Sequence, residues 1–366
     1  MTTEAAPAPV PATVEPPAEK QTWREWFDRL RLTNYGLLLV AAFVGSLVLF
    51  AIIAAVKGAN PFDVLNSMAN TITNTHSLQQ DLILTVPIGL AAMAVAIPAR
   101  AGLVNVGGEG QIIVGMVAAA GVGLHISDGV PGAVDWILMG LAGAVGGAVW
   151  AGISGLLRTL LGANEAVTTL LMNFLAADVL LYLILSPWRA SSAGQNESPP
   201  LPAHAVLPKI PGTDMHWGVV VAGVAVVLAW WLLQKTSWGF ALRVVGGNGE
   251  AARRSGLKVK VLLLSSMLVG GAFAGLGGAL HFAGVEAQLR PDTTATYGYI
   301  AFLASFLGRG KPVLVVISAF IFSAITLSGP NLESDIGGLP KTIVNVLLAL
   351  VVAAPLVVAK YRRKSS

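Results

Sequence analysis

Five polar side chains interrupt the otherwise apolar stretch LLGANEAVTTLLMNF. Asn164 is typical of the residue before a helix, where it caps free N–H groups, and Glu165 suits the positive end of the helix dipole. Asn173 is too distant to act as a cap, because at 1.5 Å per residue it lies about 12–14 Å along the helix. We therefore expect a polar helix face, with Thr168 and Thr169 among its residues, that either lines a water-filled path or hydrogen-bonds neighbouring helices.

A second polar group occurs in PARAGLVNVGGEGQ, residues 98–111. Pro98 and four glycines disfavour a regular helix here, and Asn105, Glu109 and Gln111 are costly to expose to lipid. Broken backbone is tolerated at membrane depth where it is buried in protein or faces a cavity, so we predict such a segment. The alternative is an ordinary cytoplasmic turn. A phosphate-binding loop is not predicted, since the stretch has no Lys and no preceding strand.

The most basic stretch is QKTSWGFALRVVGGNGEAARRSGLKVK, residues 234–260. Its pattern predicts a short helix over GEAARRSG, with Asn248 as the cap at its start and Gly256 as the residue that ends it. A short exposed helix that carries Arg253 and Arg254 is suited to docking in a groove of a soluble partner. The alternative is a charged anchor at the membrane surface.

The elements that position these residues are predicted to be membrane helices. The chain has 366 residues, of which 55% are hydrophobic and 11% charged, whereas soluble proteins have about 25% charged residues. The fold class we expect is all-α, a polytopic membrane protein with about ten transmembrane helices. The predicted spans are 35–56, 82–97, 111–125, 136–158, 165–186, 217–234, 261–283, 297–308, 313–328 and 342–359.

The distribution of basic residues predicts the orientation. With the N-terminus inside, only five of the 23 Lys and Arg residues fall in outside segments: Lys57, Arg189, Lys209, Arg290 and Lys341. The positive-inside rule then places both termini in the cytoplasm. The permease domain is expected at 34–360, after a disordered tail (1–20) and an interfacial helix (21–33) and before a cytoplasmic tail (361–366).

Two spans carry stripes of small residues four positions apart, which allow helix backbones to approach closely. One stripe comprises Gly143, Gly147, Ala151 and Gly155, and the other Gly271, Gly275 and Ala279. We expect both stripes to pack within the helix bundle. No metal site is predicted, because the chain has no Cys and its five His residues are scattered.

The basic stretch resembles the coupling loop of the membrane subunits of bacterial ABC importers, with its pattern GxN-x-x-A-A-R-x-x-G. GLVNVGGEGQ and NEAVTTLLMNF are similar to GLfNiGaEGQ and NEvvTTLmLNy of the simple-sugar and nucleoside branch of that family. The resemblance covers residues 33–360 and implies a type II importer fold. It assigns ATPase coupling to Arg243, Gly246, Asn248, Ala251, Ala252, Arg253, Arg254 and Gly256. It assigns the translocation path to Asn105, Glu109, Gln111, Glu165, Thr168, Thr169 and Asn173.

The resemblance further implies a permease subunit of the bacterial inner membrane that imports a nucleoside or simple sugar and hydrolyses nothing itself. No cofactor is expected in this chain, since ATP and Mg²⁺ would bind the partner ATPase subunits. The other expected partners are a second, related permease subunit in a heterodimer, an extracytoplasmic solute-binding protein and membrane lipid, with no nucleic acid. Three alternatives remain: a permease for ribose-like sugars or branched-chain amino acids, an ion-coupled secondary transporter, and a membrane-embedded enzyme.

Overall fold

The computed structural model describes residues 35–126, 131–190, 196–293, 296–336, 339–351 and 353. The predicted N-terminal tail, interfacial helix and C-terminal tail lie outside these residues. The helices are α2 (Tyr35–Val56), α3 (Pro61–Thr73), α4 (Thr75–Ala99), α5 (Gly108–His125), α6 (Gly132–Leu161), α7 (Glu165–Leu185), α8 (Gly218–Lys235), α9 (Ser237–Gly247), α10 (Gly249–Arg254), α11 (Val259–His281), α12 (Tyr297–Leu307) and α13 (Pro312–Ile336). A π-helical turn, η1 (Phe282–Glu286), extends α11, and a 3₁₀ turn, η2 (Lys341–Ile343), follows α13.

The all-helical, multi-pass prediction is confirmed for the described residues, whereas the count of ten spans is not. Within the described residues, six helical segments are long and apolar enough to cross a membrane: Thr75–Ala99, Gly132–Leu161, Glu165–Leu185, Gly218–Lys235, Val259–Glu286 and Pro312–Ile336. Helix α12 has 11 residues, so at 1.5 Å per residue it is about 16 Å long and covers about half of the hydrocarbon layer.

The two predicted stripes of small residues pack against each other in the contact between α6 and α11. A Cβ atom on Gly147 would lie closer than 3.0 Å to the Gly271 carbonyl oxygen, and one on Gly275 equally close to the Gly143 carbonyl oxygen. The backbones therefore approach as closely as glycine permits, which increases their van der Waals contact. The expectation that both stripes serve packing is confirmed.

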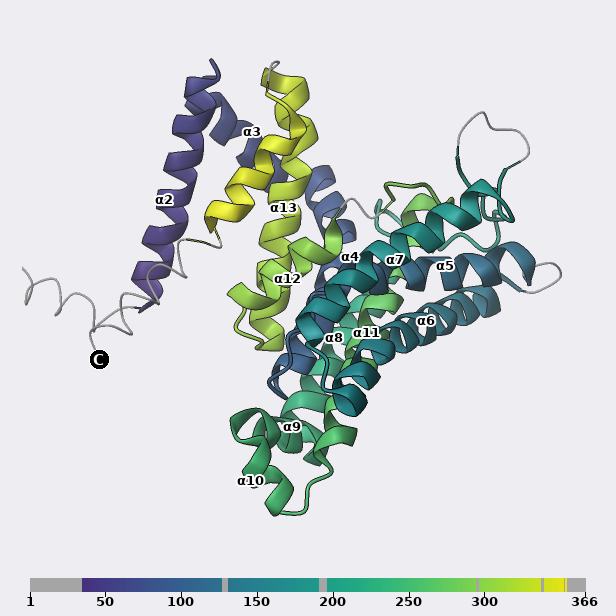
Figure 1. Ribbon diagram of the computed structural model, residues 1–366. Helices are drawn as coiled ribbons and strands as arrows, with labels where there is room; N and C mark the ends of the chain where they lie inside the picture. The colour runs from purple at the N-terminus through teal and green to yellow at the C-terminus, as the bar shows by residue number, and fades with distance from the viewer. Residues whose placement is uncertain are drawn as a thin grey trace, which may run out of the picture.

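Helix α4 lies in the middle of the molecule and contacts α11, α13, α12 and α8. Figure 1 shows α2, α3 and α13 on one side of α4 and α5, α6 and α7 on the other, with α9 and α10 together at one end beyond the long helices. This arrangement leaves α9 and α10 accessible and buries the start of α5, whereas α7 buries one face, which includes Thr169 and Asn173.

The loop before α8 covers the C-terminal end of α11 and the turn η1. The Leu207 N–H donates to the Ala283 carbonyl at 2.8 Å, and the Leu201 N–H donates to the Ala287 carbonyl at 2.8 Å. These bonds satisfy carbonyl groups that the end of a helix leaves free. The imidazole ring of His216 is buried against Gly284.

Candidate functional site

The predicted break in the backbone separates α4 from α5. Pro98 still belongs to α4, Gly102 turns the chain with a left-handed φ of +82°, and α5 begins at Gly108. Asn105 in the middle of the break has no exposed surface. The break is thus buried at Leu103, Asn105 and Gly107 and exposed at Gly102 and Val104. Its position at membrane depth stays a prediction.

Asn105 and Gln111 pair through their side-chain amides. The Asn105 Nδ2 donates to the Gln111 Oε1 at 3.2 Å, and the Gln111 Nε2 donates back to the Asn105 Oδ1 at 3.1 Å. Asn105 also donates to the Ala94 carbonyl of α4 and accepts from the Gly107 N–H, both at 2.9 Å. The pair joins the break to α4 and to the first turn of α5.

Helix α7 provides partners for the backbone groups that the break leaves outside any helix. The Asn173 Oδ1 accepts from the Gly110 N–H at 2.9 Å, and its Nδ2 donates to the Val106 carbonyl at 3.0 Å. The Thr169 hydroxyl oxygen accepts from the Val106 N–H at 3.1 Å. Buried backbone groups require such partners, so Thr169 and Asn173 hold the break in place. Asn173 lies near the middle of α7, and α5 therefore begins inside the molecule.

Glu109 joins the starts of two helices. It lies in the first turn of α5, and its Oε2 accepts from the Gly298 N–H, at the start of α12, at 2.6 Å. A carboxylate is favoured at a helix N-terminus by the free N–H groups and the helix dipole. Gly298 is required here because a Cβ atom would lie closer than 3.0 Å to the Glu109 backbone nitrogen.

The start of α7 confirms the local prediction for Asn164, whose Oδ1 accepts from the N–H groups of Ala166 and Val167 at 3.0 and 3.3 Å. Glu165 lies 3.3 Å from the Arg158 Nε and accepts from the Val104 N–H at 3.3 Å. The partly buried Thr168 donates to the Glu165 carbonyl at 3.2 Å, within its own helix.

The structure thus brings together six of the seven residues predicted for the translocation path. Five of them are buried and form what we call the polar cluster: Asn105, Glu109, Gln111, Thr169 and Asn173. Glu165 joins the break one turn away, whereas Thr168 bonds only within its own helix among the contacts seen in the described residues. The cluster makes hydrogen bonds between helices, which is one of the two alternatives for this helix face; the lining of a path by the same residues stays a prediction.

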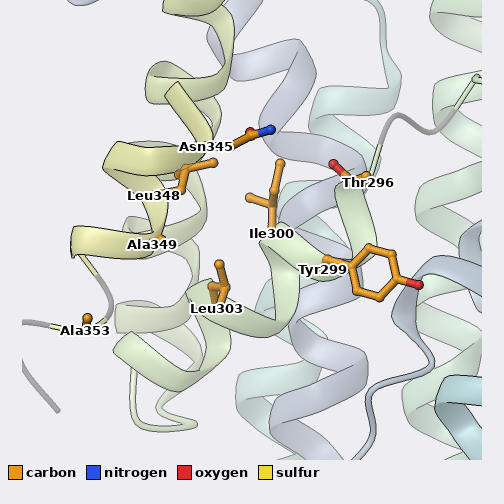
Figure 2. Close-up of a pocket in the computed structure, with 8 residues that line it drawn as sticks. All are labelled: Thr296, Tyr299, Ile300, Leu303, Asn345, Leu348, Ala349 and Ala353. Atoms are coloured by element: carbon orange, nitrogen blue, oxygen red, sulfur yellow. The ribbon is translucent and has the colours of Figure 1, made fainter. Parts of the chain in front are cut away.

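Tyr299 was not among the residues predicted for the site. Its hydroxyl oxygen accepts from the Asn173 Nδ2 at 3.4 Å, and its side chain also lines a pocket of about 410 Å³. Figure 2 shows this pocket between α12 and the helical residues that follow η2, lined by Thr296, Tyr299, Ile300, Leu303, Asn345, Leu348, Ala349 and Ala353. Most of this lining is apolar. The signal in the sequence was the pair of tyrosines in YGYIAF at the start of a short apolar helix.

The predicted short helix in the basic stretch is α10. The Asn248 Oδ1 caps it by accepting from the Ala251 N–H at 3.0 Å. Gly256 follows the end of the helix and has a left-handed φ of +85°. The side chains of Arg253 and Arg254 are 72% and 80% exposed, and both contact Glu250.

Of the other predicted coupling residues, Ala251 and Ala252 lie in α10 itself, and Arg243 and Gly246 lie in α9. Ala252 is buried and Ala251 is exposed. In α9, Arg243 donates to the Leu233 carbonyl at the end of α8, and Gly246 lies against the backbone of the break. Helices α9 and α10 therefore form one compact unit that is anchored to the membrane helices and exposes its arginines.

Known proteins with similar sequences are membrane subunits of transporters. Residues 77–358 match the family described as branched-chain amino acid transport system, permease component. The glucose ABC transporter permease protein of Haloferax volcanii is 34% identical over 86% of this chain and 84% of its own length. Two guanosine ABC transporter permease proteins of Bacillus subtilis are also similar. One is 29% identical over 88% of this chain and 93% of its own length. The other is 24% identical over 66% of this chain and 77% of its own length. The chain therefore belongs to this permease family and is a multi-pass membrane subunit of an ABC transporter.

Proposed function

We propose that this subunit serves an ATP-driven importer of a nucleoside or a simple sugar and receives the work of ATP hydrolysis at α10. The observation that carries the proposal is the capped helix α10, which lies beyond the long helices in Figure 1 and whose Arg253 and Arg254 side chains are 72% and 80% exposed. Phe240 and Val261, on either side of α10 in the sequence, are also 61% and 59% exposed. Arginines beside exposed apolar side chains are typical of protein interfaces.

In this proposal ATP and Mg²⁺ bind the partner ATPase subunits, and this chain hydrolyses nothing. A second, related permease subunit completes the membrane part as a heterodimer, which is supported by the two different guanosine permease relatives of Bacillus subtilis. A solute-binding protein delivers the solute from outside. The polar cluster, with Glu165 and Thr168, lines the path when the helices separate during transport.

Charge reversal tests the docking assignment. Arg253→Glu combined with Arg254→Glu is expected to reduce the amount of ATPase that co-purifies with the permease, because like charges at an interface cost several kcal/mol. The matched control is Arg189→Glu, which reverses an exposed arginine just after the C-terminal end of α7. This variant is expected to leave the ATPase bound. Equal ATPase recovery from all three proteins would show that α10 is not the docking helix.

The orientation is tested by labelling. The chain has no Cys, so single cysteines can be introduced by Asn196→Cys in the loop before α8 and Glu250→Cys in α10. A thiol reagent that does not cross membranes should label the first variant from outside the cell and the second only after the membrane is opened. Labelling of both from outside would refute the proposed topology.

The solute class is tested by competition. The relatives transport glucose and guanosine according to their names, and a nucleoside shares with glucose a ring that carries several hydroxyl groups. We expect guanosine or another nucleoside to compete for uptake in cells that carry the complete transporter, and binding to the solute-binding protein to show the same preference. Competition by leucine, with none by sugars or nucleosides, would assign the transporter to amino acids instead.

A further inference from the structure

The end of α9 lies directly against the turn that begins the break between α4 and α5. A Cβ atom on Gly246 would come closer than 3.0 Å to the Arg100 carbonyl oxygen and would also meet the Ala101 backbone. From the other side, a Cβ atom on Gly102 would lie 3.6 Å from the Gly246 Cα. We call residues 100–103 the relay turn. Its contact with α9 is backbone against backbone, so α9 has no room to move toward the turn without displacing it.

The relay turn is also bonded to a second structural element. The Arg100 Nη2 donates to the Gly310 carbonyl at 2.8 Å, in the turn that joins α12 to α13. Gly310 has a left-handed φ of +61°, and its neighbour Arg309 has a φ of +51°. The relay turn is therefore bonded to the turn after α12, in addition to its contact with α9.

The chain runs from the relay turn straight into the polar cluster. Val104 bonds the Glu165 side chain, Asn105 bonds α4 and Gln111, and Val106 bonds Thr169 and Asn173. None of the residues from 103 to 106 is helical. Because consecutive residues in this segment are each fixed by a hydrogen bond, a displacement of the relay turn must alter the bonds of the polar cluster or break the contact with α9.

Asn248 links α9 to α10, because it is the single residue between them and caps both. Its N–H donates to the Val244 carbonyl of α9 at 3.1 Å, and its side chain caps α10. A force applied to α10 by a docked ATPase therefore reaches Gly246, two residues before Asn248. The path from the docking helix to the relay turn is short: it runs through the Asn248 cap and ends in the backbone contact between Gly246 and Arg100.

We propose that the relay turn is the element through which ATP-driven movement of α9 and α10 reaches the polar cluster, with Arg100 and Gly246 as positioning residues. This inference rests on the proposed docking of an ATPase at α10. It adds a mechanical role for the break itself: the break is the part of the membrane domain that responds first to the ATPase. Packed interiors change between discrete arrangements and do not deform gradually, so a small shift at Gly246 is sufficient to change which cluster bonds are made.

Neighbouring glycines provide a matched pair of variants. Gly246→Ala adds a methyl group against the Arg100 carbonyl, whereas Gly247→Ala adds one with no atom within 4 Å. In the reconstituted complex with both permease subunits, the ATPase and the solute-binding protein, both variants should bind the ATPase as the wild type does. For Gly246→Ala we expect solute-stimulated ATPase activity and uptake to fall at least about tenfold, equivalent to about 1.4 kcal/mol. Gly247→Ala should retain both activities.

Hydrogen exchange of the wild-type complex tests the inference without any variant. The backbone amides of residues 104–110 should change their protection when ATP is added, because their partners in the polar cluster change. Unchanged protection would overturn the inference, as would wild-type activity of Gly246→Ala. Loss of ATPase binding in Gly246→Ala but not in Gly247→Ala would also overturn the inference, because it would place Gly246 in the docking surface. Normal ATPase binding after reversal of Arg253 and Arg254 would instead refute the proposed function.

Discussion

Asn173 offers a test in which the hydrogen-bonding and the packing roles of one residue predict opposite results. Its side chain accepts from the Gly110 N–H and donates to the Val106 carbonyl, and only 2% of it is exposed. Asn173→Leu keeps a side chain that branches at the same carbon, although a larger one, and makes neither bond. Asn173→Ala also makes neither bond but leaves a space beside the two backbone groups and the Tyr299 hydroxyl.

The difference between the two variants follows from the unmet backbone groups. A buried polar group that loses its partner costs about 1–3 kcal/mol. Two such groups lower the free energy of unfolding of Asn173→Leu by about 2–6 kcal/mol. In Asn173→Ala, a water molecule in the vacated space has three polar groups to bond, which is enough to hold it there. We therefore expect the Ala variant to be the more stable of the two.

The assay is thermal unfolding of the purified protein in detergent, with uptake measured in parallel. Leu171→Ala, at a neighbouring position of α7 that is 60% exposed, serves as the control and should unfold at nearly the wild-type temperature. The order we expect is wild type, then Asn173→Ala, then Asn173→Leu. If Asn173→Leu proved more stable than Asn173→Ala, volume and not hydrogen bonding would be what Asn173 contributes.

Three further predictions concern single positions. Glu165→Gln should reduce uptake less than Glu165→Leu, because Gln still accepts from the Val104 N–H. Gln loses only the partly exposed ion pair with Arg158, which is worth about 0–1 kcal/mol. Equal defects would show that the charge is required. Gly256→Val should reduce solute-stimulated ATPase activity more than Gly256→Asn does, because Asn tolerates the left-handed conformation and a β-branched residue does not; wild-type activity of the Val variant would contradict this. Burial and the nearby His281 lower the pKa of His216 to about 4. The unfolded chain therefore binds a proton at this residue more readily than the folded chain does. The free energy of unfolding should fall as the pH drops from 6.5 toward 4. Thermal unfolding of His216→Gln at several pH values in this range should show a smaller fall, and identical pH dependence would contradict the assignment.

Local chemistry made several features of this protein predictable from the sequence. Asn164 and Asn248 cap the helices that follow them, and Gly256 ends α10, because a cap depends on a few adjacent residues. The membrane class followed from composition and the lengths of the apolar runs. The break between α4 and α5 was predictable from its proline and glycines, although its exact limits were not.

The number of membrane spans was not predictable in this way. Residues 111–125 and 297–308 were expected as short spans because they are apolar. Helices α5 and α12 both start in the interior, where Glu109 and Gly298 meet, and neither is among the six helical segments of the described residues that are long and apolar enough to cross a membrane. Hydropathy records the composition of a segment and contains no information on where its ends lie, so a helix that covers half of the membrane looks like a short span.

The sequence by itself determined which residues are polar, which helices are capped and which faces carry glycine, because these properties reside in neighbouring residues. Only the tertiary structure decided which groups meet. Asn173 contacts Gly110 across 63 positions of sequence, and Gly246 meets Arg100 through backbone atoms that no residue type announces. Such contacts depend on how whole helices pack, since hydrogen bonds and close backbone approach require atoms to lie within a few ångströms in space, whatever their separation along the chain.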